Sequence, residues 1–190
     1  MTCLACRRWG AGILCGGCLA ALAPAPDRYL PGGLVVKAAF LHAGPARALV
    51  HRLKYEGIRP AAELLAAALV ERWGPPPDLL VPIPRAPLRA WRFGVDPALE
   101  LARAMAAISG IEVRAQLRAP LWASQRAGRR GSDRRPPRFS TRRFPVAGVL
   151  VDDVVTTGTT LSAAASALGT GPGLALVATA APPATRFAAP

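Results

Sequence analysis

At 190 residues the chain has room for one medium-sized domain with a small appendage. Hydrophobic residues make up 52% of it, which supplies a sizeable core and excludes a disordered protein, and no apolar run is long enough for a membrane-spanning helix. The formal net charge is +13, mostly from arginine, so phosphates, anionic ligands and nucleic acid are the favoured classes of partner.

The first predicted element is a metal-binding knuckle over residues 1–25. All four cysteines of the chain lie there, in two C-x-x-C pairs: Cys3, Cys6, Cys15 and Cys18. Each pair places two thiolates on one side of a tetrahedral ion, which predicts a structural Zn²⁺ in a reducing, cytoplasmic environment. Two disulfides in an exported protein are one alternative. The apolar run from Arg7-Arg8 to Ala23 also mimics a signal peptide, but its removal would discard every cysteine.

Candidate strands and helices alternate through the following domain, residues 33–190. Residues 19–31 are rich in Ala and Pro and are interpreted as a linker or docking segment. Strands are expected at 33–43, 79–81, 112–117, 149–153 and 173–180, and helices at 45–55, 60–73, 97–109 and from 159 onward. This alternation predicts an α/β fold with a mostly parallel sheet flanked by helices. Such sheets bind ligands at the carboxyl ends of their strands.

The most informative segment is the end of the strand at 149–153 and the turn after it. Two adjacent carboxylates are followed by a hydroxyl-rich turn and a helix start: Asp152, Asp153, Val154, Val155, Thr156, Thr157, Gly158, Thr159 and Thr160. Gly158 lets the backbone curl around an anion, the helix start offers free N–H donors, and ionised aspartates accept hydrogen bonds from ribose hydroxyls. The alternatives are a buried strand that ends in acids and a Walker B strand, for which the chain lacks the G-x-x-x-x-G-K-[ST] partner.

This segment resembles the phosphoribosyl pyrophosphate (PRPP) binding signature of type I phosphoribosyltransferases. The resemblance implies that these residues bind PRPP, with Mg²⁺ bridging ribose and pyrophosphate oxygens. A basic loop follows the strand at 79–81, and its Arg85, Arg89 and Arg92 are candidates for pyrophosphate contact through forked hydrogen bonds. A solvated basic loop is the alternative reading of these arginines.

A third basic feature is the arginine-rich segment between residues 114 and 143, which contains a single acid, Asp133. Arginines interleaved with an aromatic residue suit a single-stranded nucleic acid, since the charges follow its backbone and the flat ring stacks on bases. The candidates are Trp122, Arg126, Arg129, Arg130, Arg134 and Arg135. A lid over a small phosphorylated ligand and a plain solvated surface are the alternatives.

Four features occur in the order typical of ComF-family proteins, which are competence-associated, phosphoribosyltransferase-like proteins of bacteria. They are the four-cysteine knuckle, the segment Leu53-Lys54-Tyr55, the segment Val81-Pro82-Ile83-Pro84 with its arginines, and the PRPP-type signature. The chain resembles that family over most of its length. The resemblance implies a type I phosphoribosyltransferase fold, zinc at the N-terminus, and a cytoplasmic role in uptake of single-stranded DNA during natural transformation, with a helicase-like ATPase as partner.

Some positions depart from the family pattern. Residues 92–96 are Arg-Phe-Gly-Val-Asp where that family usually has Arg-Gly-Phe-Asn-Gln, so a polar pair that could read a substrate is missing. His42 and His51 have no partner at a telling spacing, and Lys54 is explained by the favourable position of an ammonium at a helix C-terminus. We therefore predict a ComF-like DNA-handling protein that binds PRPP or a related phosphoribosyl ligand. An active Mg²⁺-dependent phosphoribosyltransferase of nucleotide salvage or biosynthesis is the alternative.

Overall fold

The computed structural model describes residues 1–10, 12–120, 137–141, 147–169 and 173–182. Its centre is a five-stranded sheet with the order β1-β2-β7-β6-β3. The strands are β1 (Arg28–Leu30), β2 (Leu34–Leu41), β3 (Leu80–Pro82), β6 (Val149–Val155) and β7 (Leu174–Ala180). Neighbouring strands pair in parallel except β1, which is antiparallel to β2 at the edge. Two further short strands, β4 (Leu117–Arg118) and β5 (Ser140–Thr141), form a separate pair.

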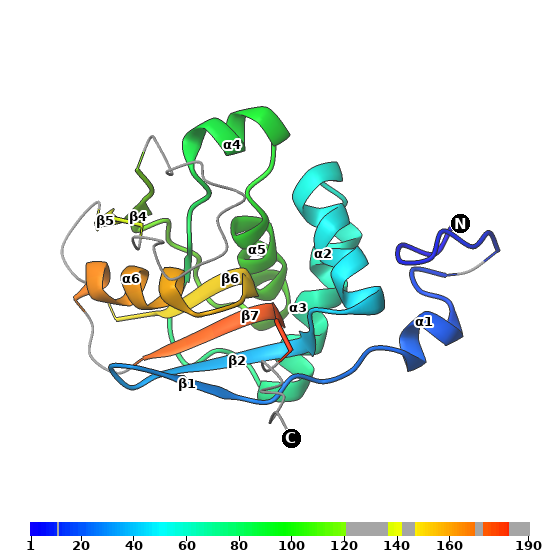
Figure 1. The fold of residues 1–190 in the computed structure, drawn as a ribbon, viewed down its shortest axis with the longest axis horizontal. Helices are drawn as coiled ribbons and strands as arrows, with labels where there is room; N and C mark the ends of the chain where they lie inside the picture. The colour runs from blue at the N-terminus through cyan, green and yellow to red at the C-terminus, as the bar shows by residue number, and fades with distance from the viewer. Residues whose placement is uncertain (11, 121–136, 142–146, 170–172, 183–190) are drawn as a thin grey trace, which may run out of the picture.

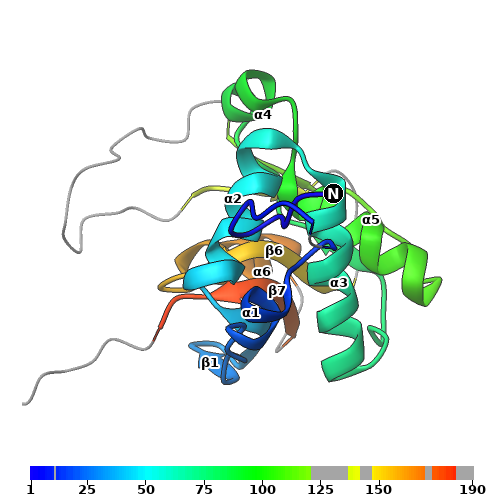
Figure 2. The ribbon, with the colours of Figure 1, turned by 90° about the vertical axis from the view of Figure 1, so that its right-hand side faces the viewer.

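Helices cover both faces of the sheet (Figures 1 and 2). On one face lie α2 (Gly44–Glu56), α3 (Arg59–Trp73) and α5 (Pro97–Ser109), and on the other lies α6 (Thr159–Leu168). Each of α2, α3 and α5 has a proline in its first turn, where the missing N–H breaks no helical bond. This arrangement confirms the expected mostly parallel α/β fold. None of the helices in the described ranges has the length and apolar character needed to cross a membrane.

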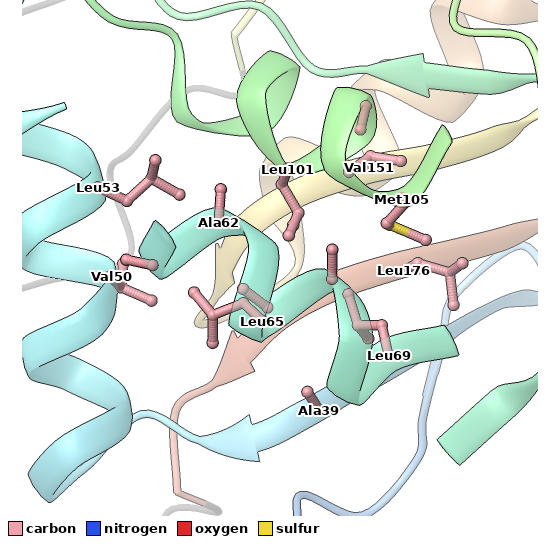
Figure 3. Packing of buried hydrophobic residues seen from close by; sticks show 14 of the residues in the cluster. Ala39, Val50, Leu53, Ala62, Leu65, Leu69, Leu101, Met105, Val151 and Leu176 are labelled. Carbon is pink, nitrogen blue, oxygen red and sulfur yellow. The ribbon is translucent and has the colours of Figure 1, made fainter. Parts of the chain in front are cut away.

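Two hydrophobic cores form, one on each face of the sheet. Figure 3 shows the larger one, where side chains from α2, α3 and α5 pack over β6 and β7. Its buried members include Leu53, Leu65, Leu69, Leu101 and Met105. On the opposite face, α6 buries Leu161, Ala164 and Leu168 within the second core. Burial at these positions fixes the strand ends, and with them the loops that follow.

Three sequence-based expectations differ from the structure. The segment 112–117 is not one continuous strand: Val113 makes an isolated parallel bridge to Leu80, Gln116 N then bonds back to Arg114 O at 2.9 Å and turns the chain, and only Leu117 belongs to a strand, β4. The segment interpreted as a linker contains β1, because Arg28–Leu30 pairs with β2. The basic loop after β3 contains a short helix, α4 (Pro87–Phe93), which also begins with a proline.

The cysteine-bearing N-terminus, which includes the short helix α1 (Gly16–Ala20), docks beside α2 (Figure 2). Leu4 and Leu14 pack against the larger core. Arg52 of α2 donates from Nε to the Leu4 carbonyl at 2.7 Å. The N-terminal segment is therefore held against the domain both by apolar packing and by a polar contact to α2.

Candidate functional site

The turn between β6 and α6 lies at the carboxyl edge of the sheet, as the sequence predicts. The strand ends at Val155, and α6 begins at Thr159 with Gly158 as its N-cap. A small cavity of about 30 Å³ is lined by Asp152, Val154, Val155, Thr156, Thr157, Gly158, Thr159, Thr160 and Leu161. Nearly all the residues of the PRPP-type signature therefore face one hollow.

This turn, which we call the phosphate loop (residues 156–160), carries converging hydrogen-bond donors. All four of its threonines are exposed, while Gly158 is buried. Thr157 Oγ1 and Thr159 Oγ1 share a hydrogen bond of 2.9 Å, which places the two hydroxyls side by side. The N–H groups in the first turn of a helix have no partner within the helix and favour an anion. The loop can thus bind one phosphate group through hydroxyls, amides and the helix dipole.

Strand β1 supports the phosphate loop from outside, which sequence reasoning missed. Arg28 Nη1 donates to the Thr156 carbonyl at 2.8 Å, and its Nη2 donates to the Ala181 carbonyl. Leu30 packs against Gly158, where a Cβ would come within 2.6 Å of its Cδ atoms. Arg28 therefore joins the ends of β6 and β7, and Leu30 occupies the space beside the glycine. No sequence motif marks Arg28 or Leu30, because a three-residue strand between prolines is too short to show a periodic pattern.

The two aspartates of β6 occupy different environments. Asp153 is only 6% exposed, and its Oδ2 lies 2.8 Å from Lys54 Nζ of α2. The contact is an ion pair, and Asp153 Oδ2 has no hydrogen-bond partner among the described residues. Asp152 Oδ1 accepts a hydrogen bond from Asp153 N at 2.8 Å. Burial, followed by the neighbouring Asp153 charge, raises the pKa of Asp152 well above its usual value.

The end of β2 places a histidine close to this acid pair. His42 Nδ1 lies 2.8 Å from Thr179 Oγ1, and that hydroxyl donates to the Asp153 carbonyl at 3.3 Å. Burial and the nearby Lys54 ammonium lower the pKa of His42, which favours the neutral ring. His42, to which the sequence assigns no role, therefore braces the backbone of the acid pair through Thr179.

The three arginines predicted to contact pyrophosphate lie in two settings. Arg85 Nη1 donates to the carbonyls of Lys54 and Val95, at 2.9 and 3.2 Å. Its guanidinium also lies 4.8 Å from the centre of the Phe93 ring. Arg89 and Arg92 are exposed on α4. The structure thus brings Arg85 beside Lys54, whereas Arg89 and Arg92 lie on the surface of α4; their role in pyrophosphate binding stays a prediction. The proposed nucleic-acid residues, Trp122, Arg126, Arg129, Arg130, Arg134 and Arg135, fall outside the described residues.

The four cysteines form a compact cluster of free thiols. Their sulfur atoms all lie within 4.8 Å of one another, and the closest hydrogen-bonded pair, Cys6 and Cys15, is 3.7 Å apart. Tetrahedral Zn²⁺ with Zn–S bonds of about 2.3 Å requires sulfurs roughly 3.8 Å apart, so the cluster fits this ion. Burial alone would raise the pKa of Cys3, but N–H groups of Cys15, Cys6 and Ala5 donate to it and lower that pKa to about 6. The thiolate form that binds metal is thereby favoured.

The chain matches no protein family model and no curated protein. Among solved structures it is similar to a hypoxanthine phosphoribosyltransferase from Staphylococcus aureus, with 15% identity over 64% of this chain and 61% of that one, and a TM-score of 0.34. It is also similar to the glutamic acid and alanine mutants from a study of an invariant aspartic acid in HPRTs, at 17% and 16% identity. Those two matches cover 64% of this chain and 66% of theirs, with TM-scores of 0.38 and 0.37. Such a distant likeness transfers no residue role to this chain.

Proposed function

We propose that the chain binds a ligand that carries a ribose 5-phosphate, such as PRPP or a related phosphoribosyl compound. The observation that carries this proposal is the phosphate loop, where hydroxyls and helix N–H groups converge beside two carboxylates. The loop would hold the 5-phosphate, and Asp152 and Asp153 would accept hydrogen bonds from the ribose hydroxyls. Mg²⁺ would be held chiefly by oxygens of PRPP, with Asp152 as an available carboxylate donor, and would neutralise the diphosphate.

Whether the bound ligand reacts is a separate matter. In an active phosphoribosyltransferase of nucleotide salvage or biosynthesis, pyrophosphate would leave C1 of the ribose and an acceptor would attack it. The chain's residues would then position the sugar and stabilise charge, so no covalent nucleophile is required. This enzyme is the alternative to a binding protein, since a fold of this kind does not by itself imply catalysis.

Calorimetry with PRPP and Mg²⁺ tests the proposed ligand. The double variant Thr157→Val, Thr159→Val removes two hydroxyl donors to a charged group, so the affinity should fall by about tenfold or more. Ser166→Ala is the matched control, because Ser166 lies at the far end of α6 and bonds only to Ser162 O within the helix. Equal affinities of both variants and the wild type would reject the loop as the phosphate site.

We further propose a ComF-like role in handling single-stranded DNA during natural transformation, in the cytoplasm and with a helicase-like ATPase. Two exposed tryptophans favour a nucleic-acid partner. Trp91 is 86% exposed on α4 between the exposed Arg89 and Arg92, and Trp9 is 80% exposed beside Arg8. Exposed rings next to arginines offer bases a stacking surface and the backbone a countercharge.

A salt titration of oligonucleotide binding tests the DNA proposal. If six or more phosphates are contacted, the affinity should fall by roughly 10³-fold between about 50 and 200 mM salt. Trp91→Ala should weaken binding by about fivefold or more through lost stacking, whereas Tyr29→Ala, an exposed aromatic on β1, should not. A flat salt response, or equal effects of the two variants, would count against this role. In a transformable host, deletion of the gene should also abolish transformation.

A further inference from the structure

Lys54 reaches the acid pair from the last turn of α2. Its ammonium lies 2.8 Å from Asp153 Oδ2, and its side chain is 25% exposed. The position at a helix C-terminus therefore does not explain this lysine, since its partner is a buried carboxylate on β6. An ammonium held this close balances the charge of Asp153 inside the protein.

Lys54 offsets part of the charge of the acid pair. Lys54 compensates Asp153, and Asp152 accepts the Asp153 N–H. Lys54 thus supplies from within the protein part of the positive charge that a divalent cation would bring to two adjacent carboxylates.

Two arginines of the described residues that lie near the site have partners within the protein. Arg85 donates to the carbonyls of Lys54 and Val95 and stacks on Phe93. Arg28 donates to two carbonyls at the ends of β6 and β7. Within the described ranges, a diphosphate on the ribose would have to draw Lys54 or Arg85 away from these contacts, or rely on the exposed arginines of α4. The phosphate loop, in contrast, offers donors for one phosphate in its exposed threonine hydroxyls and in the N–H groups of the first turn of α6.

We infer that this site is built for a ribose 5-phosphate monoester in preference to PRPP, and that Lys54 is the positioning residue that makes its binding independent of Mg²⁺. The inference rests on the proposed function and names its ligand class more narrowly. Lys54 holds the Asp153 carboxylate in place as an acceptor for a ribose hydroxyl, while the loop binds the single phosphate. Mg²⁺ chiefly screens a diphosphate, and a monoester lacks that group.

Calorimetry on the wild-type protein tests this directly with ribose 5-phosphate and PRPP, each with and without Mg²⁺. We expect the affinity for ribose 5-phosphate to change by less than about twofold when Mg²⁺ is added. We also expect PRPP with Mg²⁺ to bind no more than about threefold tighter than ribose 5-phosphate. Neither measurement depends on a variant that could fail to fold.

Variants of Lys54 then assign the effect to this residue. Lys54→Met should weaken ribose 5-phosphate binding by about tenfold or more without Mg²⁺, and added Mg²⁺ should restore much of it by supplying the missing cation. Lys54→Arg should keep the wild-type behaviour. The matched control is Lys37→Met, since Lys37 is the only other lysine of the chain and lies on β2 over the Trp73 ring, 4.5 Å from its centre. It should bind as the wild type does.

The outcomes separate this inference from the proposed function. PRPP with Mg²⁺ binding tenfold or more tighter than ribose 5-phosphate would overturn the inference and leave the proposed function standing. A requirement for Mg²⁺ in wild-type ribose 5-phosphate binding, or the same loss in Lys37→Met as in Lys54→Met, would also overturn it. Failure of both ligands to bind would overturn the inference and the proposed function together.

Discussion

Gly158 sets the geometry of the phosphate loop through its backbone. Its φ of 82° lies in the left-handed region that glycine alone adopts readily. As the N-cap of α6, it also aims the N–H groups of the first helical turn. We expect Gly158→Ala to lower the free energy of unfolding by about 1–2 kcal/mol. Ribose 5-phosphate affinity should fall by about tenfold, because relief of the strain moves the donors.

Gly169→Ala provides a matched control for Gly158→Ala, because Gly169 ends the same helix with a φ of 66°. It should lower stability through the same left-handed backbone strain, seen as a fall in Tm of about 2–4 °C per kcal/mol, and leave ligand affinity unchanged. Thermal denaturation and calorimetry on both variants check this. Equal losses of affinity would show that reduced stability, rather than loop geometry, weakens binding.

Sequence patterns identified the residues of the site that lie in one continuous segment. Asp152, Asp153 and Gly158 were found because a strand, a turn and a helix start follow one another there. Arg28 was missed, because it reaches the Thr156 carbonyl across 128 positions and only the fold brings them together. The sequence explains Lys54 only by its position at the end of a helix, because nothing in that helix indicates a contact with Asp153 on β6.

At the scale of elements, the long segments were predictable and the short ones were not. The helix predicted at 97–109 is α5, and the helices predicted at 45–55 and 60–73 match α2 and α3 to within one residue at each end. Prolines at their starts and apolar periodicity carry that information. β1 and α4 span three and seven residues, too few for a period to show. β1 contacts the phosphate loop, and α4 contacts α2, the helix that carries Lys54, so sequence alone did not reveal these surroundings of the site.

At the scale of the whole molecule, α2 contacts both the knuckle predicted at 1–25 and the sheet of the domain predicted at 33–190. Arg52 of this helix contacts the knuckle at the Leu4 carbonyl, and Lys54, two residues further on, contacts Asp153. The members of both cores nevertheless lie overwhelmingly in elements from β2 onward, and the knuckle adds mainly partly buried side chains. The domain should therefore keep its fold when the knuckle is lost.

Removal of the metal tests that division. A Zn²⁺ chelator should unfold the knuckle, because four thiolates hold it and little apolar packing replaces them. Acid should do the same, since protons compete with the metal for the thiolates. Native mass spectrometry should show one Zn²⁺ before treatment, and hydrogen exchange should then rise in residues 1–25 while β6 and β7 stay protected. Cys18→Ser should reproduce this pattern without chelator.

Loss of protection throughout the sheet would instead make the knuckle part of the domain's folding unit, and unchanged exchange would argue against a structural metal.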